Sequence, residues 1–386
     1  MRLTCSFAVI LSAATALVSQ EVAVPGFHTE KVQASYVLAV PPRHDTKKAT
    51  PLILDFHGAC PPLSKGANLT NKRVWSKFVT KENVLVLGLN SRTRSWNTTK
   101  GAKDDPAYAL HVLDAVRKKH ALKTDEVYLA GFSSGSDFLC KGGFQLRGKF
   151  AGSLVVCPGP ASVLGIRKGE ILRVKDHPFY FVTGEKDYIR KDGAWQAFLM
   201  LEKTCSHVMY REVPNVGHSF PSTAEYQRCF HYLRVLAGKI KKPDDRKIAD
   251  TAFVRADYLL ASTHALKLGR KGRDLLDQIE ERGKAMRRKA EGVSWKRAPG
   301  RAYEMRWRVM TQFHRFPELT NAAKRELAED RGISNADMLR ARGRYYRRGG
   351  RIPVPVTPTW RPPQDKKKVK STTAAEALIN QASKKK

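Results

Sequence analysis

The stretch Val127-Tyr128-Leu129-Ala130-Gly131-Phe132-Ser133-Ser134-Gly135 predicts a strand that turns sharply into a helix. An apolar run ends in Gly-x-Ser-x-Gly, and a helical pattern follows through Phe138, Leu139 and Cys140. Glycines are needed on both sides of the serine because a strained turn leaves no room for neighbouring β-carbons. The pattern therefore predicts that the Ser133 hydroxyl is lifted clear of a sheet, as a candidate nucleophile.

The segments around this turn alternate between apolar runs and helical patterns. Expected strands cover 34–40, 51–58, 84–90, 152–157, 178–183 and 208–213, and expected helices cover 106–120, 194–203 and 225–236. This alternation predicts an α/β fold with a mostly parallel sheet and helices on both of its faces. In such folds, functional sites gather at the carboxyl ends of the strands.

Two downstream residues suit the partners that a nucleophilic serine requires. The serine needs a general base, and the base needs an acid that fixes its tautomer. Asp187, just after the expected strand at 178–183, is the candidate acid, and His218 is the candidate base. They follow Ser133 in the order nucleophile, acid, histidine, as expected after this kind of turn. Glu185 is the competing acid, and a routine hydrogen-bonding role is the alternative for His218.

Charge that develops on a tetrahedral oxyanion requires backbone donors aimed at it in advance. The N–H of Ser134, next to the candidate nucleophile, is one expected donor. The second is expected in the loop after the strand that ends at His57, from the N–H of Ala59 or Gly58. Trp96 follows another expected strand end and is a candidate for the substrate pocket, with packing in a surface loop as the alternative.

Four segments carry a family resemblance: Leu54–Gly58, Gly131–Gly135, Gly184–Asp187 and Gly217–Pro221. Together they resemble the α/β-hydrolases and, more narrowly, secreted esterases grouped with polyhydroxybutyrate depolymerases and feruloyl esterases. In that group an acid three residues after a glycine and a Gly-His-x-aromatic-Pro segment recur. The resemblance covers roughly residues 30 to 237. It implies the α/β-hydrolase fold, with Asp187 and His218 in the roles given above.

The same resemblance implies hydrolysis of carboxylic esters through an acyl-enzyme, with an ester substrate and no cofactor. One departure concerns the oxyanion segment, which reads His57-Gly58-Ala59-Cys60 rather than a run of glycines. A serine peptidase of the prolyl-oligopeptidase type shares the triad and is the alternative enzyme, although no propeller-like repeats accompany it. No Cys/His cluster has the spacing of a zinc site, so no metal is expected.

The formal net charge of +34 is concentrated in the C-terminal part of the chain. Residues 1–240 carry +14, and the shorter remainder carries +20. Such a field attracts polyanions, so an anionic polymer or envelope surface is a candidate partner. This partner suggests a function from another class, that of a binding protein in which the hydrolase domain is secondary. A solvated basic face is the alternative that needs no partner.

The first residues predict an export signal, and the last residues predict a tail. Arg2, the apolar segment 3–18 and the small-x-small site Ala14-Thr15-Ala16 are typical of a signal peptide, and a buried N-terminal strand or helix is the alternative. No later segment is apolar enough to span a membrane, which predicts a periplasmic or extracellular protein. The expected organisation is a signal peptide, a catalytic domain, a basic helical region and a Pro/Lys-rich disordered tail, at 1–20, 26–240, 241–351 and 352–386.

Within the basic region, helices are expected at 244–266, 274–288, 302–313, 321–330 and 335–346. The stretch Arg342–Arg351 interleaves arginine with tyrosine, which suits an anionic surface. Five cysteines follow the expected signal, and a Cys205–Cys229 disulfide is one arrangement that export permits. The alternative is that the cysteines are buried as small hydrophobic residues.

Overall fold

The computed structural model describes residues 17–18, 22–28, 33–60, 66–70, 74–96, 104–141, 150–159, 175–187, 190–205, 207–241 and 243–328. The chain divides into two compact units, Met1–Ile240 (unit 1) and Lys241–Lys386 (unit 2). Most of the expected signal, the expected helix at 335–346, the stretch Arg342–Arg351 and the tail lie outside the described residues.

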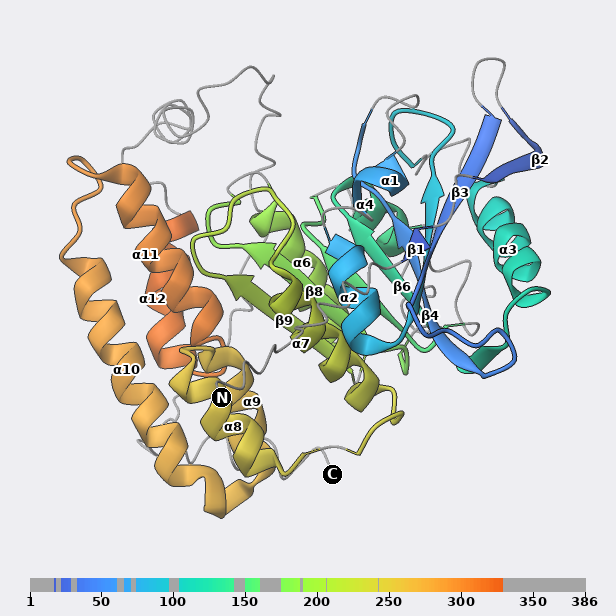
Figure 1. Ribbon diagram of the computed structural model, residues 1–386. Coiled ribbons are helices and arrows are strands. Elements are labelled where there is room, and N and C mark those ends of the chain that lie inside the picture. The colour runs from blue at the N-terminus through green and yellow to red at the C-terminus, as the bar shows by residue number, and fades with distance from the viewer. Residues whose placement is uncertain are drawn as a thin grey trace, which may run out of the picture. The chain divides into compact units, whose positions relative to one another are not determined.

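A single sheet organises the described part of unit 1 (Figure 1). Its nine strands are β1 (Leu17–Val18), β2 (Val22–His28), β3 (Gln33–Val40), β4 (Thr50–Phe56), β5 (Leu85–Asn90), β6 (Leu122–Phe132), β7 (Gly152–Val156), β8 (Phe179–Gly184) and β9 (Val208–Val213). Their order is β1-β3-β5-β4-β6-β7-β8-β9, with β2 paired to β3. Strands β4 to β9 are parallel, and β1 to β3 form an antiparallel edge.

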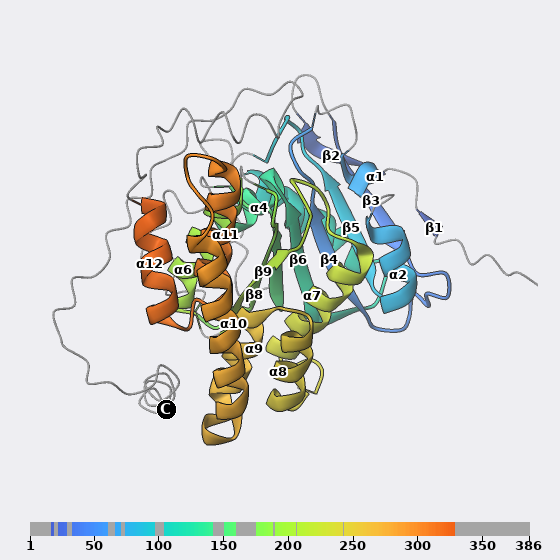
Figure 2. The same cartoon turned by 90° about the vertical axis from the view of Figure 1, so that its left-hand side faces the viewer.

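This mostly parallel sheet, with helices against it and a serine on the turn after β6, is the α/β-hydrolase fold predicted from the sequence. Figure 2 shows β4, β6, β8 and β9 from another side. The expected strands are present, and the apolar run at 127–132 is the second half of a longer strand, β6. The short strands β1 and β2 were not predicted, because their segment was assigned to the signal and to the link after it.

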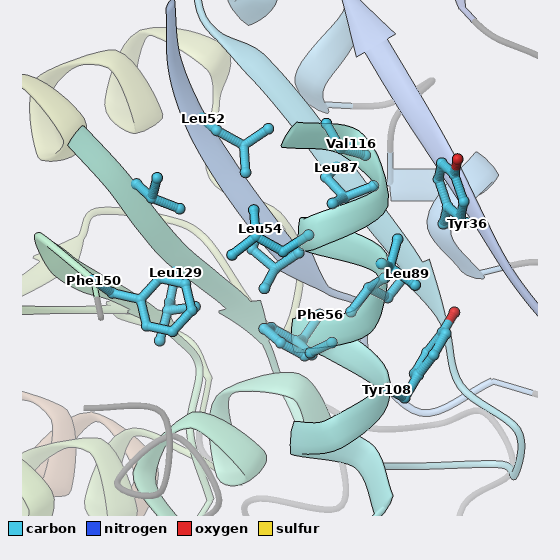
Figure 3. Close-up of a cluster of buried hydrophobic side chains, with 14 of the residues drawn as sticks. Tyr36, Leu52, Leu54, Phe56, Leu87, Leu89, Tyr108, Val116, Leu129 and Phe150 are labelled. Carbon is cyan, nitrogen blue, oxygen red and sulfur yellow. The ribbon is translucent and has the colours of Figure 1, made fainter. Parts of the chain in front are cut away.

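The central strands are buried on both faces, which explains their nearly continuous apolar sequence. Every residue of β4, β5, β7 and β8 is buried. On one face, α3 (Asp104–Arg117) packs Tyr108 and Val116 against leucines of the sheet (Figure 3). The helix α4 (Ser134–Lys141), which begins directly after Ser133, adds Phe138 to the same cluster.

The opposite face is covered by α2 (Ser76–Glu82) and α7 (Thr223–Leu236), which contact each other. The ring of Phe230 from α7 packs edge-on against Tyr128 of β6, with ring centroids 5.0 Å apart. Two further helices of unit 1 are α1 (Gly66–Thr70) and α6 (Lys191–Glu202), and α6 packs against β8 and β9. The Asp55 side chain points to the face that α2 and α7 cover, because successive residues of a strand point to opposite faces and its neighbours Leu54 and Phe56 belong to the α3 face.

The described part of unit 2 is helical. Its helices are α8 (Asp245–Val254), α9 (Tyr258–Lys267), α10 (Arg273–Glu291), α11 (Pro299–Gln312) and α12 (Pro317–Ala328). The single helix expected at 244–266 was wrong, since α8 and α9 are separate. Ala256 has a φ of 54° in the left-handed region, and the Asp257 carboxylate accepts from the N–H of Leu260 at 3.4 Å. The chain therefore turns between the two helices.

A buried arginine, Arg306 of α11, links α11 to α10 and α12. Its guanidinium donates to the carbonyl oxygen of Ala290, at the end of α10, at 2.7 Å. It also forms an ion pair with Glu326 of α12 and lies 4.8 Å from the centre of the Trp295 ring. Because the side chain is buried, this charge is matched by a carboxylate and by carbonyl groups, as a buried charge requires.

Two absences apply to the described residues alone. None of the helices described has the length and apolar character needed to cross a membrane. The five cysteines among these residues are free thiols, so Cys205 and Cys229 do not form the disulfide that was considered. Four of the five are buried and Cys60 is half-buried, in line with their role as small hydrophobic residues.

Candidate active site

Ser133 occupies a strained turn between β6 and α4. Its φ of 53° lies in the left-handed region, which residues with a β-carbon seldom adopt. The Ser133 N–H donates to the carbonyl oxygen of Val156 at 2.9 Å. A β-carbon on Gly135 would overlap the carbonyl oxygen of Phe56, and one on Gly131 would lie 2.7 Å from the Gly135 backbone. Both glycines are therefore required for the turn to form.

The structure brings the candidate base and acid to this serine. His218, in the loop after β9, places its Nε2 atom 3.1 Å from Ser133 Oγ. Its Nδ1 atom lies 2.8 Å from Oδ2 of Asp187, which follows β8 and is fully buried. A carboxylate at Nδ1 keeps the ring proton there and leaves Nε2 free to accept the serine proton. The three side chains thus form one continuous chain of hydrogen bonds.

The competing acid, Glu185, contacts the backbone of the histidine loop. Its Oε2 atom accepts from the N–H of Asn215 at 2.9 Å, which holds the start of the histidine loop. A β-carbon on Gly184 would overlap the carbonyl oxygen of Val216, so the end of β8 presses closely against that loop. Glu185 and Gly184 therefore position the loop, and Asp187 contacts the imidazole.

Asp187 is held by the start of α6. Its Oδ1 atom accepts from the backbone N–H of Arg190 at 3.1 Å. The Arg190 guanidinium donates to Asp137 of α4 at 2.7 Å, and Asp137 also accepts from the N–H of Gly159 at 2.6 Å. Arg190 and Asp137 together thus connect α4 with the segments after β7 and β8. Sequence reasoning missed Arg190 because its side-chain partner Asp137 lies 53 positions away along the chain.

The loop after β4 runs beside the nucleophile. A β-carbon on Gly58 would lie 2.8 Å from the Phe132 ring and 3.4 Å from Cβ of Ser133, so Gly58 permits this close approach. The next residue, Ala59, is exposed. The N–H of Cys60 donates to the carbonyl oxygen of Arg94. Ser134 opens α4, where backbone N–H groups lack helical partners. Both expected sources of oxyanion donors therefore flank Ser133.

His57 and Trp96 fix this loop, a role that the sequence did not reveal. His57 Nδ1 donates to the carbonyl oxygen of Gly58 at 2.6 Å, and its Nε2 accepts from the N–H of Ser91 at 3.0 Å. Burial lowers the pKa of His57, so the ring is neutral, as these two bonds require. The position of His57 directly after a buried strand was the available signal.

Trp96 was expected in the substrate pocket, and the structure places it in the core. Its side chain is 2% exposed and packs edge-on against Phe56 at a centroid distance of 5.0 Å. The indole N–H donates to the carbonyl oxygen of His57 at 2.8 Å. This placement favours a role in supporting the oxyanion loop over direct contact with substrate.

Two aromatic residues that the sequence analysis did not single out lie beside the imidazole. The ring of Phe132 stacks on His218 with centroids 5.2 Å apart, and it contacts Phe220 at 4.3 Å. Both are only partly buried; Phe132 is a variable position of Gly-x-Ser-x-Gly, and Phe220 is the aromatic position of the Gly-His-x-aromatic-Pro segment. They therefore give the site an apolar wall next to the base.

Cys157, directly after β7, is a further neighbour of the acid. Burial and the adjacent Asp187 carboxylate raise the pKa of this thiol, which stays protonated and donates to Asp187. Among the described residues, Cys157, Asp187 and His218 form a group whose potential metal-ligating atoms lie within 4.8 Å of one another.

No family model and no curated protein matches this sequence. Solved structures with some likeness include a fungal esterase from Rhizomucor miehei, with 14% identity, 58% of this chain and 86% of the other covered, and a TM-score of 0.46. A ferulic acid esterase from Anaeromyces mucronatus has 14% identity, 57% and 92% coverage and a TM-score of 0.43. A thermostable esterase has 18% identity, 57% and 60% coverage and a TM-score of 0.39.

The chain thus spans 60% of the length of that thermostable esterase. At such low TM-scores and identities the likenesses carry no argument about substrate or activity. The fold follows instead from the strand order of the sheet, its parallel crossovers and the serine turn after β6.

Proposed function

We propose that unit 1 is a serine hydrolase that cleaves carboxylic esters through an acyl-enzyme. The observation that carries this proposal is the hydrogen-bond chain from Asp187 through His218 to Ser133. The serine lies on a strained turn, and the loop that contains Gly58 passes beside it. Nucleophile, base, acid and a place for oxyanion donors are the parts that acyl transfer requires.

The proposed reaction begins when Ser133 Oγ attacks the acyl carbon while His218 Nε2 takes its proton. Asp187 stabilises the imidazolium that forms, and the N–H of Ser134 with that of Ala59 or Gly58 stabilises the oxyanion. Collapse of the tetrahedral intermediate expels the alcohol, which receives the proton from His218. Water, activated by the same histidine, then releases the acid from Ser133.

The test replaces the nucleophile. Ser133→Ala should lower the turnover of short p-nitrophenyl esters by a factor on the order of 10⁴ or more, and a fluorophosphonate label should attach to wild-type Ser133. Ser76→Ala, at the start of α2, is the control and should retain both properties. A wild-type protein that neither turns over esters nor takes the label would refute the proposal. Polyhydroxybutyrate oligomers and feruloyl esters belong in the substrate panel because of the sequence resemblance.

Export remains part of the proposal. The apolar segment after Arg2 and the Ala14-Thr15-Ala16 site motivate it. Cleavage after Ala16 would retain Leu17 and Val18, which pair with Val40 and Ala39 of β3. Expression with secretion followed by N-terminal sequencing tests this: a retained Met1 on the secreted-fraction protein, or absence from that fraction, speaks against a cleaved signal.

A second proposed function is the binding of an anionic polymer by unit 2. Four exposed basic side chains lie along the end of α10, the link after it and the start of α11: Lys289, Lys296, Arg297 and Arg301. None of them makes an ion pair with a described residue, whereas Arg287 nearby is paired with Glu291 at 2.7 Å. This local excess of positive charge, rather than the net charge alone, supports the proposal. Binding of the full chain to heparin or a polynucleotide tests it.

A further inference from the structure

The position of Cys157 is set by the topology of the sheet. Strand β7 lies between β6, which delivers Ser133, and β8, which delivers Asp187. Because parallel strands end at the same edge, the residue after β7 must lie between nucleophile and acid. Like Ser133, Cys157 has a φ of 53°, a conformation that is strained for a residue with a β-carbon. Two strained residues therefore sit at adjacent strand ends in the same site.

The environment of Cys157 differs from that of the other thiols. Its sulfur, a carboxylate oxygen of Asp187 and a ring nitrogen of His218 all lie within 4.8 Å of one another. Sulfur, imidazole nitrogen and carboxylate oxygen are the ligands that zinc and the softer divalent metals take up. Cys60 also lies near a histidine, 3.4 Å from Nδ1 of His57, but that nitrogen is already engaged with the Gly58 carbonyl.

We propose that Cys157, Asp187 and His218 form a binding site for a thiophilic divalent metal of the zinc and cadmium class, and that its occupation switches the triad off. The metal reaches the site from solvent past His218, since 29% of the His218 side chain is exposed and the other two residues are buried. Water supplies a fourth ligand, as in other sites with three protein ligands.

The ligand chemistry explains the inhibition. The metal takes Nδ1 of His218, so the single proton of the neutral ring moves through solvent to Nε2. A protonated Nε2 cannot accept the hydroxyl proton of Ser133, and Asp187 no longer holds the ring in its productive orientation. The carboxylate is already deprotonated, and the thiol proton passes to the buffer. One proton is released for each metal bound, and no electrons are transferred.

Inhibition of turnover by the metal rests on the proposed hydrolase function, whereas metal binding does not. The experiment therefore measures metal binding and ester turnover separately. Cadmium is the probe, because a cadmium–thiolate bond has an ultraviolet charge-transfer absorption that reports binding without any activity. Full-length wild type should bind one cadmium ion with this absorption, and Cys157→Ser should lose it. Cys60→Ala is the matched control and should keep the band, which excludes the more accessible thiol as the ligand.

Ester turnover is then measured with and without cadmium, each variant against its own metal-free value. Wild type should lose turnover in step with the absorption band, and Cys157→Ser should not respond. If Cys157→Ser does not fold by circular dichroism, His218→Gln replaces it and should lose the band at equimolar cadmium. A band that persists in these variants, or vanishes in Cys60→Ala, overturns the site. If the wild-type protein shows no ester turnover even without metal, the hydrolase proposal is refuted and the metal site is not.

Discussion

Asp55 lies in β4 with its side chain directed to the face of the sheet that α2 and α7 cover, and it is 2% exposed. Burial raises the pKa of this carboxyl to about 7, and the indole N–H of Trp75 offsets only part of the shift. The pKa of the Tyr226 phenol, whose ring lies 5.1 Å from that of Trp75, is also raised, mainly by burial and in part by the neighbouring Asp55. The folded protein therefore holds Asp55 neutral over much of the acidic range.

The sign of the effect on stability follows from proton counting. An ordinary aspartate has a pKa of 3.8, so between about pH 4 and pH 7 the folded chain keeps a proton that the unfolded chain has lost. Stability then falls as the pH rises through this window. Asp55→Asn should remove the fall, and its gain over wild type in the free energy of unfolding should grow from pH 4 to pH 7 and then level off.

At about 1.4 kcal/mol for each pKa unit, the upper limit of this gain is about 4 kcal/mol. Urea unfolding at a series of pH values measures it. Asp114→Asn, at an exposed position on α3, is the control, and its difference from wild type should stay flat. A flat difference for Asp55→Asn as well would show that the buried carboxyl is ionised in the folded protein.

At the same scale, Ser133, Asp187 and His218 could be singled out from the sequence because each sits in a short glycine-containing segment and the three follow a fixed order. Arg190 and His57 could not, because their roles depend on partners that are far away in the chain. The bond from Arg190 to Asp137 joins residues 53 positions apart, and the bond from Trp96 to His57 spans 39. Such pairings exist only once the sheet has brought the loops together.

At the scale of elements, α8 and α9 show how a local cap overrides a periodic pattern. The apolar spacing through Ile248, Phe253 and Leu260 continues across the break, which is why one helix was expected. Asp257 ends that continuity, because its carboxylate competes for backbone N–H groups at the start of α9. The short apolar runs of β4, β5, β7 and β8 were easier to interpret. Each is bounded by turn residues and is too short for a typical helix, so a buried strand was the favoured structure.

Removal of this cap gives an element-scale prediction. Asp257→Ala should lower the free energy of unfolding by about 1 kcal/mol, because the N–H of Leu260 loses its acceptor. Asp277→Ala, at an exposed position within α10, is the matched control and should change it by less than about 0.5 kcal/mol. Urea unfolding followed by far-ultraviolet circular dichroism compares the two. Equal effects would mean that Asp257 does not act as a cap.

At the scale of the whole molecule, ion pairs occur in both units, and unit 2 carries in addition a group of exposed basic side chains outside such pairs within the part of the chain that the structure describes. In unit 1, acidic side chains are placed against basic ones, as in the pairs of Glu126 with Arg234 at 2.8 Å and of Arg211 with Glu225 at 3.2 Å. In unit 2, the four basic residues at the end of α10 and the start of α11 make no such pairs with described residues. Composition reveals the excess charge, but only the structure shows which side chains carry it.

The polymer-binding proposal gives the prediction at this scale. The logarithm of the affinity of the full chain for a single-stranded polynucleotide should fall linearly with the logarithm of salt concentration, by about 0.7 for each phosphate contact. Replacement of Lys289, Lys296, Arg297 and Arg301 by glutamine should flatten this slope by about 3 and leave ester turnover intact. Binding that is insensitive to salt, or a slope unchanged by the four substitutions, contradicts this surface as the binding site.

The placement of β9 at the edge of the sheet has a consequence for the timing of synthesis. Ser133 emerges from the ribosome well before His218, which follows the last strand of the sheet. A nascent chain that has completed only β1 to β8 already holds the nucleophile and the acid, but it has no base. The hydrogen-bond chain from Asp187 to Ser133 therefore cannot form until the loop after β9 has been made, so the proposed reactivity of the serine is withheld until late in the synthesis of unit 1.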